Sequence, residues 1–408
     1  MKLNDLQTQD TKQNYARPID ALLGEVGFIE RKGKSGVLLV HGLTGTPTEM
    51  KQFGKAIARQ GFTVACPEMA GHCDSIEALS ATKWIDWYHS IEVAFDALKQ
   101  ECDHVFIAGL SMGALIALLV AAKKKDQVAG VILLSTTFFY DGWNVPIFKQ
   151  KILLPLVLYS PLKYFMQWEE TSPYGIKDER TRALVHAVLE NRDSQAANKI
   201  GYFKTPATVI LESVRMIKAA KKSLKEVISP ALIVHSTEDD MASVKNAHYT
   251  QANIASKTIE TFFVDDTYHV LTLDKRKDDV AKRAAQFCKV SGGGLDADSE
   301  IAFMLDQCHN IEPKIPGQIR SVMNVQEATA KALLVDAGAL AEAQQRGDVL
   351  GANAVLMDAY NTDVRPLLAE LRTGLGLDPD PIDAYARSGY GDRIVAERVD
   401  GQQAGWGA

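Results

Sequence analysis

Residues 104–122 read HVFIAGLSMGALIALLVAA, and this stretch decides the fold. An apolar, β-branched run ends in Gly109-Leu110-Ser111-Met112-Gly113 and opens directly into a segment apolar enough to be a buried helix. A strand, a tight turn and a helix with Gly-x-Ser-x-Gly at the turn form the nucleophile-elbow pattern. The glycines let the backbone turn sharply and let a substrate approach the serine. The helix N-terminus points backbone N–H groups at negative charge that develops beside it. The pattern therefore predicts Ser111 as a nucleophile.

The composition is that of an ordinary globular protein, with 46% hydrophobic and 24% charged residues. The net charge of −6 gives no indication of nucleic-acid binding. Five cysteines are an odd number without framework spacing, which favours reduced thiols and a cytoplasmic setting. The polar first residues lack the apolar core of a signal peptide. The longest apolar stretch, 108–122, is shorter than the ~20 residues that span a bilayer. We expect no nucleic-acid partner and no stable membrane insertion.

Short apolar strands alternate with helices along the first part of the chain. Besides the run before Ser111, the expected strands span 28–30, 36–40, 62–67, 128–135, 231–236 and 258–264, and the clearest amphipathic helix spans 82–101. This alternation predicts an α/β fold, a mostly parallel sheet with helices on both faces. Ligands of such sheets bind at the carboxyl ends of the strands, where Ser111 and the turn at His41-Gly42 both fall.

The alternation breaks between residues 141 and 226. This stretch holds apolar and amphipathic helical segments, several prolines in its first half and no clear strand. We interpret it as a helical lid inserted above the sheet. Its apolar side chains would pack on the sheet or line a pocket: Ile147, Phe148, Leu153, Leu154, Leu156, Val157, Tyr159, Phe165 and Met166.

At 408 residues the chain is long for one domain and suggests a large domain with a segment appended. We expect a flexible N-terminus (1–17), a catalytic domain (18–290), a linker (291–296), a helical appendage (297–375) and a disordered tail (376–408). Residues 1–290 contain 27 Lys and 9 Arg, whereas residues 291–408 contain 2 Lys and 7 Arg. This reversal indicates a different origin for the end of the chain, either natural acquisition or fusion. Its helices are either a passive appendage or a surface for self-association.

A serine nucleophile needs a general base within hydrogen-bond reach, and the base needs a carboxylate to orient it. After a nucleophile elbow these two residues follow in the order acid, then histidine. His248 and His269 remain once the histidines before Ser111, in the lid, inside a strand and beyond the composition break are set aside. His269 follows the last expected strand, where this fold places its base. Five carboxylates at strand ends are candidates for the acid: Glu238, Asp239, Asp240, Asp265 and Asp266.

Four motifs together resemble those of bacterial carboxylesterases, α/β-hydrolases related to the monoacylglycerol lipases. They are HGLTG at 41–45, GLSMG at 109–113, TEDDM at 237–241 and YHVLTLD at 268–274, in order within residues 20–290. The resemblance implies an α/β-hydrolase fold with a lid, and it selects Asp239 as the orienting acid and His269 as the base. It also implies that the second oxyanion-hole donor is the N–H of Leu43, beside that of Met112, the residue after the nucleophile.

Two further residues near these motifs, His41 and Cys73, lie outside the predicted catalytic set. His41 is expected to be a structural hydrogen-bonding group rather than a catalyst. Gly71-His72-Cys73 departs from the relatives, which have Gly-His-Gly there. Cys73 is either a bystander or an accessible thiol that makes activity sensitive to alkylation.

The sequence predicts a serine carboxylesterase that hydrolyses short- to medium-chain acyl esters or monoacylglycerols through an acyl-enzyme. Its partner is a small-molecule ester, and no metal or organic cofactor is implied. Three alternatives stay open. They are thioesterase or amidase chemistry on the same triad, an assembly role for the C-terminal helices, and a lid that lies on membrane surfaces.

Overall fold

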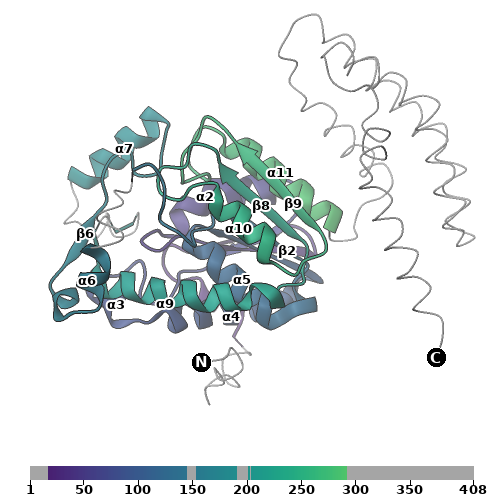
Figure 1. Cartoon of the computed structure of the whole chain (residues 1–408). Coiled ribbons are helices and arrows are strands. Elements are labelled where there is room, and N and C mark those ends of the chain that lie inside the picture. The colour runs from purple at the N-terminus through teal and green to yellow at the C-terminus, as the bar shows by residue number, and fades with distance from the viewer. Residues whose placement is uncertain (1–16, 145–152, 191–200, 203, 292–408) are drawn as a thin grey trace, which may run out of the picture. The chain divides into compact units, whose positions relative to one another are not determined.

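A seven-stranded sheet forms the centre of the computed structural model (Figure 1), which describes residues 17–144, 153–190, 201–202 and 204–291. The strands lie in the order β1-β3-β2-β4-β5-β8-β9, and each neighbouring pair is parallel except β1 with β3. They span Phe28–Glu30 (β1), Ser35–Val40 (β2), Thr63–Cys66 (β3), His104–Leu110 (β4), Gly130–Leu134 (β5), Ala231–Ser236 (β8) and Ile259–Val264 (β9). The predicted mostly parallel sheet is confirmed.

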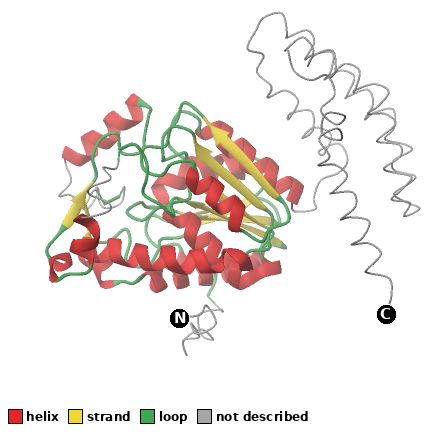
Figure 2. Ribbon diagram, in the orientation of Figure 1, coloured by secondary structure: helices red, strands yellow, loops and turns green. Residues whose placement is uncertain are grey.

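Helices cover both faces of the sheet (Figure 2). One face packs against α4 (Trp84–Glu101), α5 (Met112–Lys124) and α9 (Ala207–Ser223), and the other against α2 (Pro47–Ala58) and α11 (Lys277–Ser291). Alternate residues of β2 point to opposite faces of the sheet. Leu38 and Val40 join the core under α4 and α5, whereas Val37 and Leu39 join the core under α2 and α11. Burial on both faces explains why the strands are continuous apolar runs.

The other described elements outside the segment between β5 and β8 are short, as is one 3-10 helix within it. They are α3 (Ile76–Ala81), α10 (Lys245–Asn253) and the 3-10 helices Ile19–Leu22, Lys125–Gln127 and Leu224–Glu226. Helix α2 follows the His41-Gly42 turn. Thr46 caps the helix by accepting a hydrogen bond from the N–H of Thr48, and Pro47 takes the first helical position.

The segment inserted between β5 and β8 contains more than helices. It holds α6 (Leu154–Leu158), a 3-10 helix (Pro161–Tyr164), β6 (Gln167–Glu169), α7 (Glu179–Glu190), β7 (Lys204–Pro206) and α9. β6 and β7 form a two-stranded antiparallel ribbon, which the sequence pattern missed because three-residue strands are too short to show a period. The other difference concerns α9. Val209 and Met216 are buried in the same core as α5, so α9 covers the sheet rather than belonging to a lid above it.

The apolar side chains of the inserted segment fall into two groups. Val157 is buried with Leu158 in a small separate core, against which Leu153 and Leu154 also pack. Others are exposed to solvent: Leu156 by 63%, Tyr159 by 65%, Phe165 by 85% and Met166 by 36%. Ile147 and Phe148 lie outside the described residues, as do residues 1–16 of the expected N-terminal segment and the linker, appendage and tail from residue 292 onward.

Candidate active site

Ser111 lies at a sharp corner between β4 and α5. Its φ of 56° and ψ of −112° are strained for a residue with a side chain. The flanking glycines allow this corner. A Cβ on Gly109 would lie 2.2 Å from the backbone of Gly113, and a Cβ on Gly113 would lie 2.3 Å from the carbonyl oxygen of Val40. The turn therefore places the serine hydroxyl at the carboxyl end of the sheet, at the N-terminus of a helix.

Three side chains from distant parts of the chain form one series of hydrogen bonds. His269 Nε2 lies 2.8 Å from Ser111 Oγ. On its other side, His269 Nδ1 lies 2.8 and 3.0 Å from the two carboxylate oxygens of Asp239. Ser111 follows β4, Asp239 follows β8 and His269 follows β9, so the parallel sheet brings all three to the same edge.

Asp239 is fixed by its own loop. Its Oδ1 accepts hydrogen bonds from the N–H groups of Met241 at 2.9 Å and Ala242 at 2.7 Å. Burial opposes ionisation of Asp239, but the neighbouring His269 outweighs it, so the pKa of Asp239 lies below its ordinary value. Burial also opposes the charged form of His269, yet Asp239 raises the pKa of the imidazole above its ordinary value. The pair is built to carry an imidazolium beside a carboxylate.

The other sequence candidates have different partners. Asp240 is buried and accepts a hydrogen bond from the N–H of Gly175 at 3.2 Å, and burial raises its pKa. The remaining carboxylates form ion pairs: Glu238 with Lys177, Asp265 with Arg276, and Asp266 with Lys177 and Lys275. The ring of His248 packs against that of Phe263, with centroids 5.3 Å apart. Of the candidates, the structure brings only Asp239 and His269 into the series that reaches Ser111.

Two histidines hold the loop after β2. His41 Nε2 accepts a hydrogen bond from the N–H of Met69 at 3.2 Å, so its Nδ1 carries the proton and donates it to the carbonyl of Gly42 at 3.0 Å. His72 Nε2 contacts the carbonyl of Leu43. Burial lowers the pKa of His72 to about 4 and that of His41 well below its ordinary value. Both rings are therefore neutral near pH 7 and act as hydrogen-bonding groups.

Two carboxylates that the sequence reasoning missed contact the same loop. Glu49 Oε1 accepts a hydrogen bond from the N–H of Gly42 at 2.5 Å, and Glu170 Oε1 accepts one from Thr44 Oγ1 at 2.9 Å. Burial raises the pKa of Glu49 to about 7 and also raises that of Glu170. Glu49 lies in α2, seven residues after Gly42. Glu170 comes from the inserted segment, so its contact with Thr44 joins residues too far apart in sequence for a local pattern to predict.

Polar residues after β5 also reach the site. Thr137 Oγ1 lies 3.1 Å from Ser111 Oγ, and Ser135 Oγ donates to the backbone carbonyl of His269 at 2.7 Å. Neither was singled out from the sequence. The available signal was their position, since Ser135-Thr136-Thr137 follows the strand next to β4 at its carboxyl end.

Cys73 adopts a left-handed backbone conformation, with φ of 67°. Its side chain is half-buried, and burial raises the pKa of the thiol above its ordinary value. The thiol is therefore protonated near neutral pH, which favours the bystander role over a reactive one.

Over the ranges given above, two further features bear on function. None of the described helices combines the length and the apolar character that crossing a membrane requires. The described side chains also contain no group of three or more His, Cys, Asp or Glu residues arranged to hold a metal ion.

Comparisons with known proteins place this chain in a family. The family model Hydrolase_4, described as serine aminopeptidase, S33, matches residues 31–276. A thermostable monoacylglycerol lipase of Bacillus sp. (strain H-257) is 30% identical over 266 residues, which are 65% of this chain and 95% of that protein. A solved structure of the metagenome-derived lipolytic enzymes LipS and LipT is 25% identical, with a TM-score of 0.56, and the match covers 66% of this chain and 99% of that one.

A different kind of protein matches over a shorter stretch. A probable sugar isomerase of Mesorhizobium japonicum is 44% identical over 97 residues, which are 24% of this chain and 23% of that protein. The lipase match spans nearly the whole of its relative, and the family model matches more than half of this chain. The fold is that of an α/β-hydrolase, the enzyme is a serine hydrolase of the esterase and monoacylglycerol lipase type, and the chain belongs to the serine aminopeptidase S33 family.

Proposed function

We propose that this chain is a serine carboxylesterase that hydrolyses short- to medium-chain acyl esters or monoacylglycerols, with Ser111, His269 and Asp239 as its catalytic residues. The unbroken series of hydrogen bonds from Ser111 Oγ through the imidazole of His269 to Asp239 carries this proposal. The 30% identity to a monoacylglycerol lipase over 95% of that enzyme supports lipid esters as the substrate class.

The reaction follows from the positions of these three groups. Ser111 Oγ attacks the ester carbonyl carbon while His269 Nε2 takes its proton. The imidazolium then gives this proton to the leaving alcohol oxygen, and an acyl-enzyme remains. Water then loses a proton to His269 and attacks the acyl carbonyl. The imidazolium returns this proton to Ser111 Oγ as the carboxylic acid leaves. Asp239 holds the Nδ1–H and stabilises the imidazolium, for which its depressed pKa is suited because the carboxylate stays charged.

The N–H groups of Leu43 and Met112 bind the developing oxyanion in this proposal. Within the described part of the chain, no hydrogen bond uses either N–H group. Met112 supplies the first N–H of α5, where the helix dipole also favours negative charge. The Leu43 N–H shares a peptide plane with the carbonyl of Gly42 and points the opposite way. The hydrogen bond from His41 to that carbonyl therefore sets the direction of the donor.

Glu170 is suited to bind the alcohol part of a monoacylglycerol. It reaches Thr44, the residue after Leu43, from the inserted segment. Glycerol carries free hydroxyl groups that can donate hydrogen bonds to a carboxylate, whereas a simple alkyl alcohol loses its only hydroxyl on esterification. We infer that this contact favours monoacylglycerols over plain alkyl esters.

Amide hydrolysis on the same three residues is the second candidate, because the matching family model carries the description serine aminopeptidase. The chemistry is the same apart from the leaving group, an amine that His269 must protonate as it departs. A thioester leaving group would use the same steps.

The test is hydrolysis of p-nitrophenyl esters from acetate to palmitate, 1-monoacylglycerols of matching chain length and alanine p-nitroanilide, each by wild type and Ser111→Ala. We expect ester turnover with an optimum at short or medium chains, lost by about 1,000-fold or more in the variant. Ester hydrolysis that persists in Ser111→Ala would reject the catalytic assignment. Faster turnover of the anilide than of every ester would instead support the amidase.

A further inference from the structure

Asp274, a fully buried carboxylate, joins the inserted segment to the loop that carries His269. It accepts five hydrogen bonds: from the N–H groups of Lys177 (2.8 Å), Asp178 (2.7 Å), Tyr268 (2.7 Å) and Lys275 (2.9 Å) and from the hydroxyl of Thr267 (3.0 Å). These donors fill the acceptor capacity of a carboxylate, which is about four lone-pair sites. A buried charge so completely hydrogen-bonded holds its donors in one arrangement.

The donors come from two segments far apart in sequence. Two belong to residues 174–178, which we call the strap, a stretch of the inserted segment that leads into α7. Two others belong to residues 267 and 268, directly before His269, and the fifth is the N–H of Lys275, the residue after Asp274 itself. Asp274 is thus a single acceptor shared by the strap and the histidine loop.

The strap also lies against His269. A Cβ built on Gly175 would be 3.1 Å from the Cβ of His269 and 2.9 Å from a methyl carbon of Val270. The carbonyl of Gly175 accepts a hydrogen bond from the N–H of Val270 at 2.8 Å, and its own N–H donates to Asp240. Gly175 has φ of +71°, a conformation that suits glycine. The strap therefore contacts the loops that carry Asp239 and His269.

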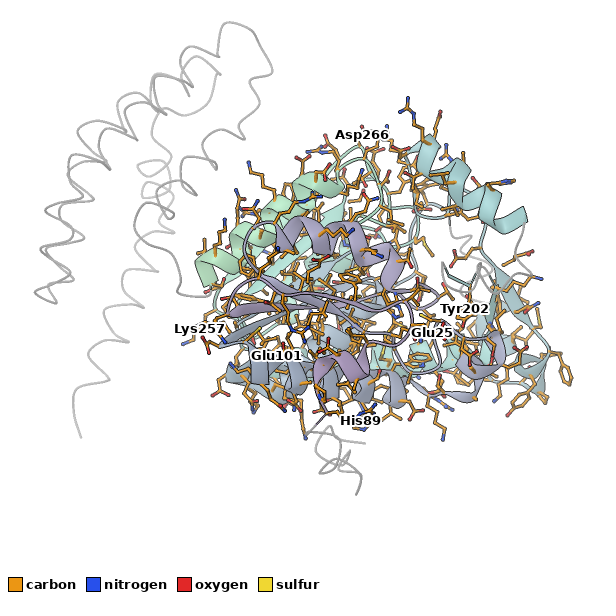
Figure 3. The ribbon with its side chains drawn as sticks, turned by 180° about the vertical axis from the view of Figure 1, so that it is seen from behind. Glu25, His89, Glu101, Tyr202, Lys257 and Asp266 are labelled. Atoms are coloured by element: carbon orange, nitrogen blue, oxygen red, sulfur yellow. The ribbon has the colours of Figure 1, made fainter. Side chains whose placement is uncertain are left out.

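Surface ion pairs reinforce this arrangement only weakly. Lys177 Nζ lies 2.6 Å from Glu238 and 3.1 Å from Asp266, which Figure 3 labels at the top of the domain. Asp266 is 53% exposed at its side chain, and exposed pairs of this kind contribute little. The buried carboxylate of Asp274, rather than the exposed ion pairs, has the contacts needed to hold the strap in place against the loop that carries His269.

We propose that Asp274 is a positioning residue for His269, which by fixing the strap against the histidine loop sets the place of the imidazole between Ser111 and Asp239. Asp274 makes no hydrogen bond with the side chain of any of these three residues in the described part of the chain, so it acts through the backbone on either side of His269. The inference rests on the proposed function, in which His269 is the general base. It adds a residue whose role is geometric.

The test is Asp274→Asn, measured for kcat, KM and pH dependence with a p-nitrophenyl ester. The amide keeps the shape of the side chain but offers one acceptor oxygen and turns an NH₂ group toward backbone N–H donors. We expect kcat to fall by about 10- to 100-fold, as for a displacement near 1 Å, with little change in KM. The acid limb of the pH profile should move to lower pH, because His269 loses part of the contact with Asp239 that raises its pKa.

Glu92→Gln is the matched control. Glu92 is also buried, at 4% exposure, and pairs with His89 and Lys124 on the helices α4 and α5, away from the strap. It should lower stability while leaving kcat per folded molecule and the acid limb as in wild type. If Asp274→Asn behaves like this control, with only stability reduced, the inference is wrong.

Thr267→Val keeps the experiment decisive if Asp274→Asn does not fold. It replaces one of the five donors by a methyl group of similar size, so we expect the same changes to be smaller. The kcat should fall by about 2- to 5-fold, and the acid limb should move in the same direction. A wild-type profile in Thr267→Val would overturn the inference. Ser111→Ala is measured alongside to separate this inference from the proposed function. Activity retained in Ser111→Ala would reject the catalytic assignment, whereas the Asp274 and Thr267 variants test only the positioning role.

Discussion

Thr137 Oγ1 lies 3.1 Å from Ser111 Oγ and donates its own proton to the carbonyl of Ser135 at 3.0 Å. A hydroxyl has one proton, so Thr137 meets the serine as an acceptor. It therefore competes with His269 Nε2, 2.8 Å away, for the proton that must move in the first step of the proposed reaction.

Removing this competing acceptor should not harm catalysis. In Thr137→Val the Ser111 hydroxyl has His269 as its remaining acceptor, and we expect kcat/KM to stay within about 3-fold of wild type or to rise. Steady-state kinetics with a p-nitrophenyl ester measure this directly. A loss of more than 10-fold would mean that Thr137 holds Ser111 in its reactive rotamer.

The pH dependence should reflect the raised pKa of His269. The general base must be neutral, and Asp239 raises its pKa above the ordinary value of 6.5. We expect the acid limb of kcat/KM above pH 6.5 and, in Asp239→Asn, a fall in kcat of about 10,000-fold because the Nδ1 partner is lost. The same pairing stabilises the fold fully below pH 6.5, and this contribution is lost as pH rises through the folded pKa. An acid limb well below pH 6 would contradict the pairing.

Glu49 gives a more specific pH effect. Burial raises its pKa to about 7, and its charge helps to raise the pKa of His269. Glu49→Gln keeps an acceptor for the Gly42 N–H but removes the charge, so we expect the acid limb to move to lower pH. A raised carboxyl pKa costs stability once the group ionises, so the glutamine variant should gain stability at pH 8 and not at pH 4.

Glu49→Ala is the companion variant. It also removes the acceptor that holds Gly42, and we expect kcat to fall by about 10-fold as the Leu43 donor loses its fixed direction. Thermal unfolding at two pH values and pH–rate profiles measure both effects. Equal pH–rate profiles for Glu49→Gln and wild type would show that the charge of Glu49 does not affect the pKa of His269.

Glu170 should discriminate between substrates rather than between chemical steps. Glu170→Gln removes the charge beside Thr44 while keeping the size of the side chain. We expect kcat/KM for a 1-monoacylglycerol to fall by about 10-fold, because one charged hydrogen bond to the glycerol part is lost. The kcat/KM for the p-nitrophenyl ester of the same acid should change little. A parallel loss on both substrates would argue that Glu170 supports the loop and does not bind glycerol.

The thiols should be unreactive. Cys66, Cys102 and Cys288 are buried, and burial raises the pKa of the half-buried Cys73. Iodoacetamide at pH 8 should therefore leave kcat unchanged, measured in a Cys308→Ser background because Cys308 lies outside the described residues. Progressive inactivation that Cys73→Gly abolishes would show instead that this thiol is accessible.

The parts of the fold that could be predicted are those with a repeating pattern. β4, the elbow and α5 follow from one apolar run interrupted by two glycines, and the parallel sheet follows from the alternation around it. The pattern could not distinguish α9 from a lid helix, because an amphipathic helix has the same spacing whether its apolar face covers a sheet or a neighbouring helix. β6 and β7 have no pattern at all, being only three residues each.

Sequence order and motif resemblance brought forward Ser111, Asp239 and His269, and their catalytic roles stay a prediction. Thr137 and Glu170 escaped that reasoning, and Asp274 entered it only as the last residue of a motif, because their contacts join residues 26, 126 and up to 97 positions apart. The contacts of Glu170 and Asp274 depend on how the inserted segment folds back, which no local spacing records.

The separate origin of the C-terminal segment also stays a prediction. The reversal in lysine and arginine usage suggests it, and the chain resembles both a lipase and, over 97 residues, a sugar isomerase. A composite chain would show these two kinds of likeness. Self-association through this segment is a proposal that the mass of the full chain in solution would test.

The order of the proposed catalytic residues along the chain has a consequence for synthesis on the ribosome. Ser111 is made early, but His269 and the helix α11, which buries Phe287 against the sheet, come last in the hydrolase domain. Residues 292–408 follow as another 117 residues, which take roughly 6 to 23 s to translate at about 5–20 residues per second. The domain therefore has time to close its sheet and assemble its site while the nascent chain is still attached.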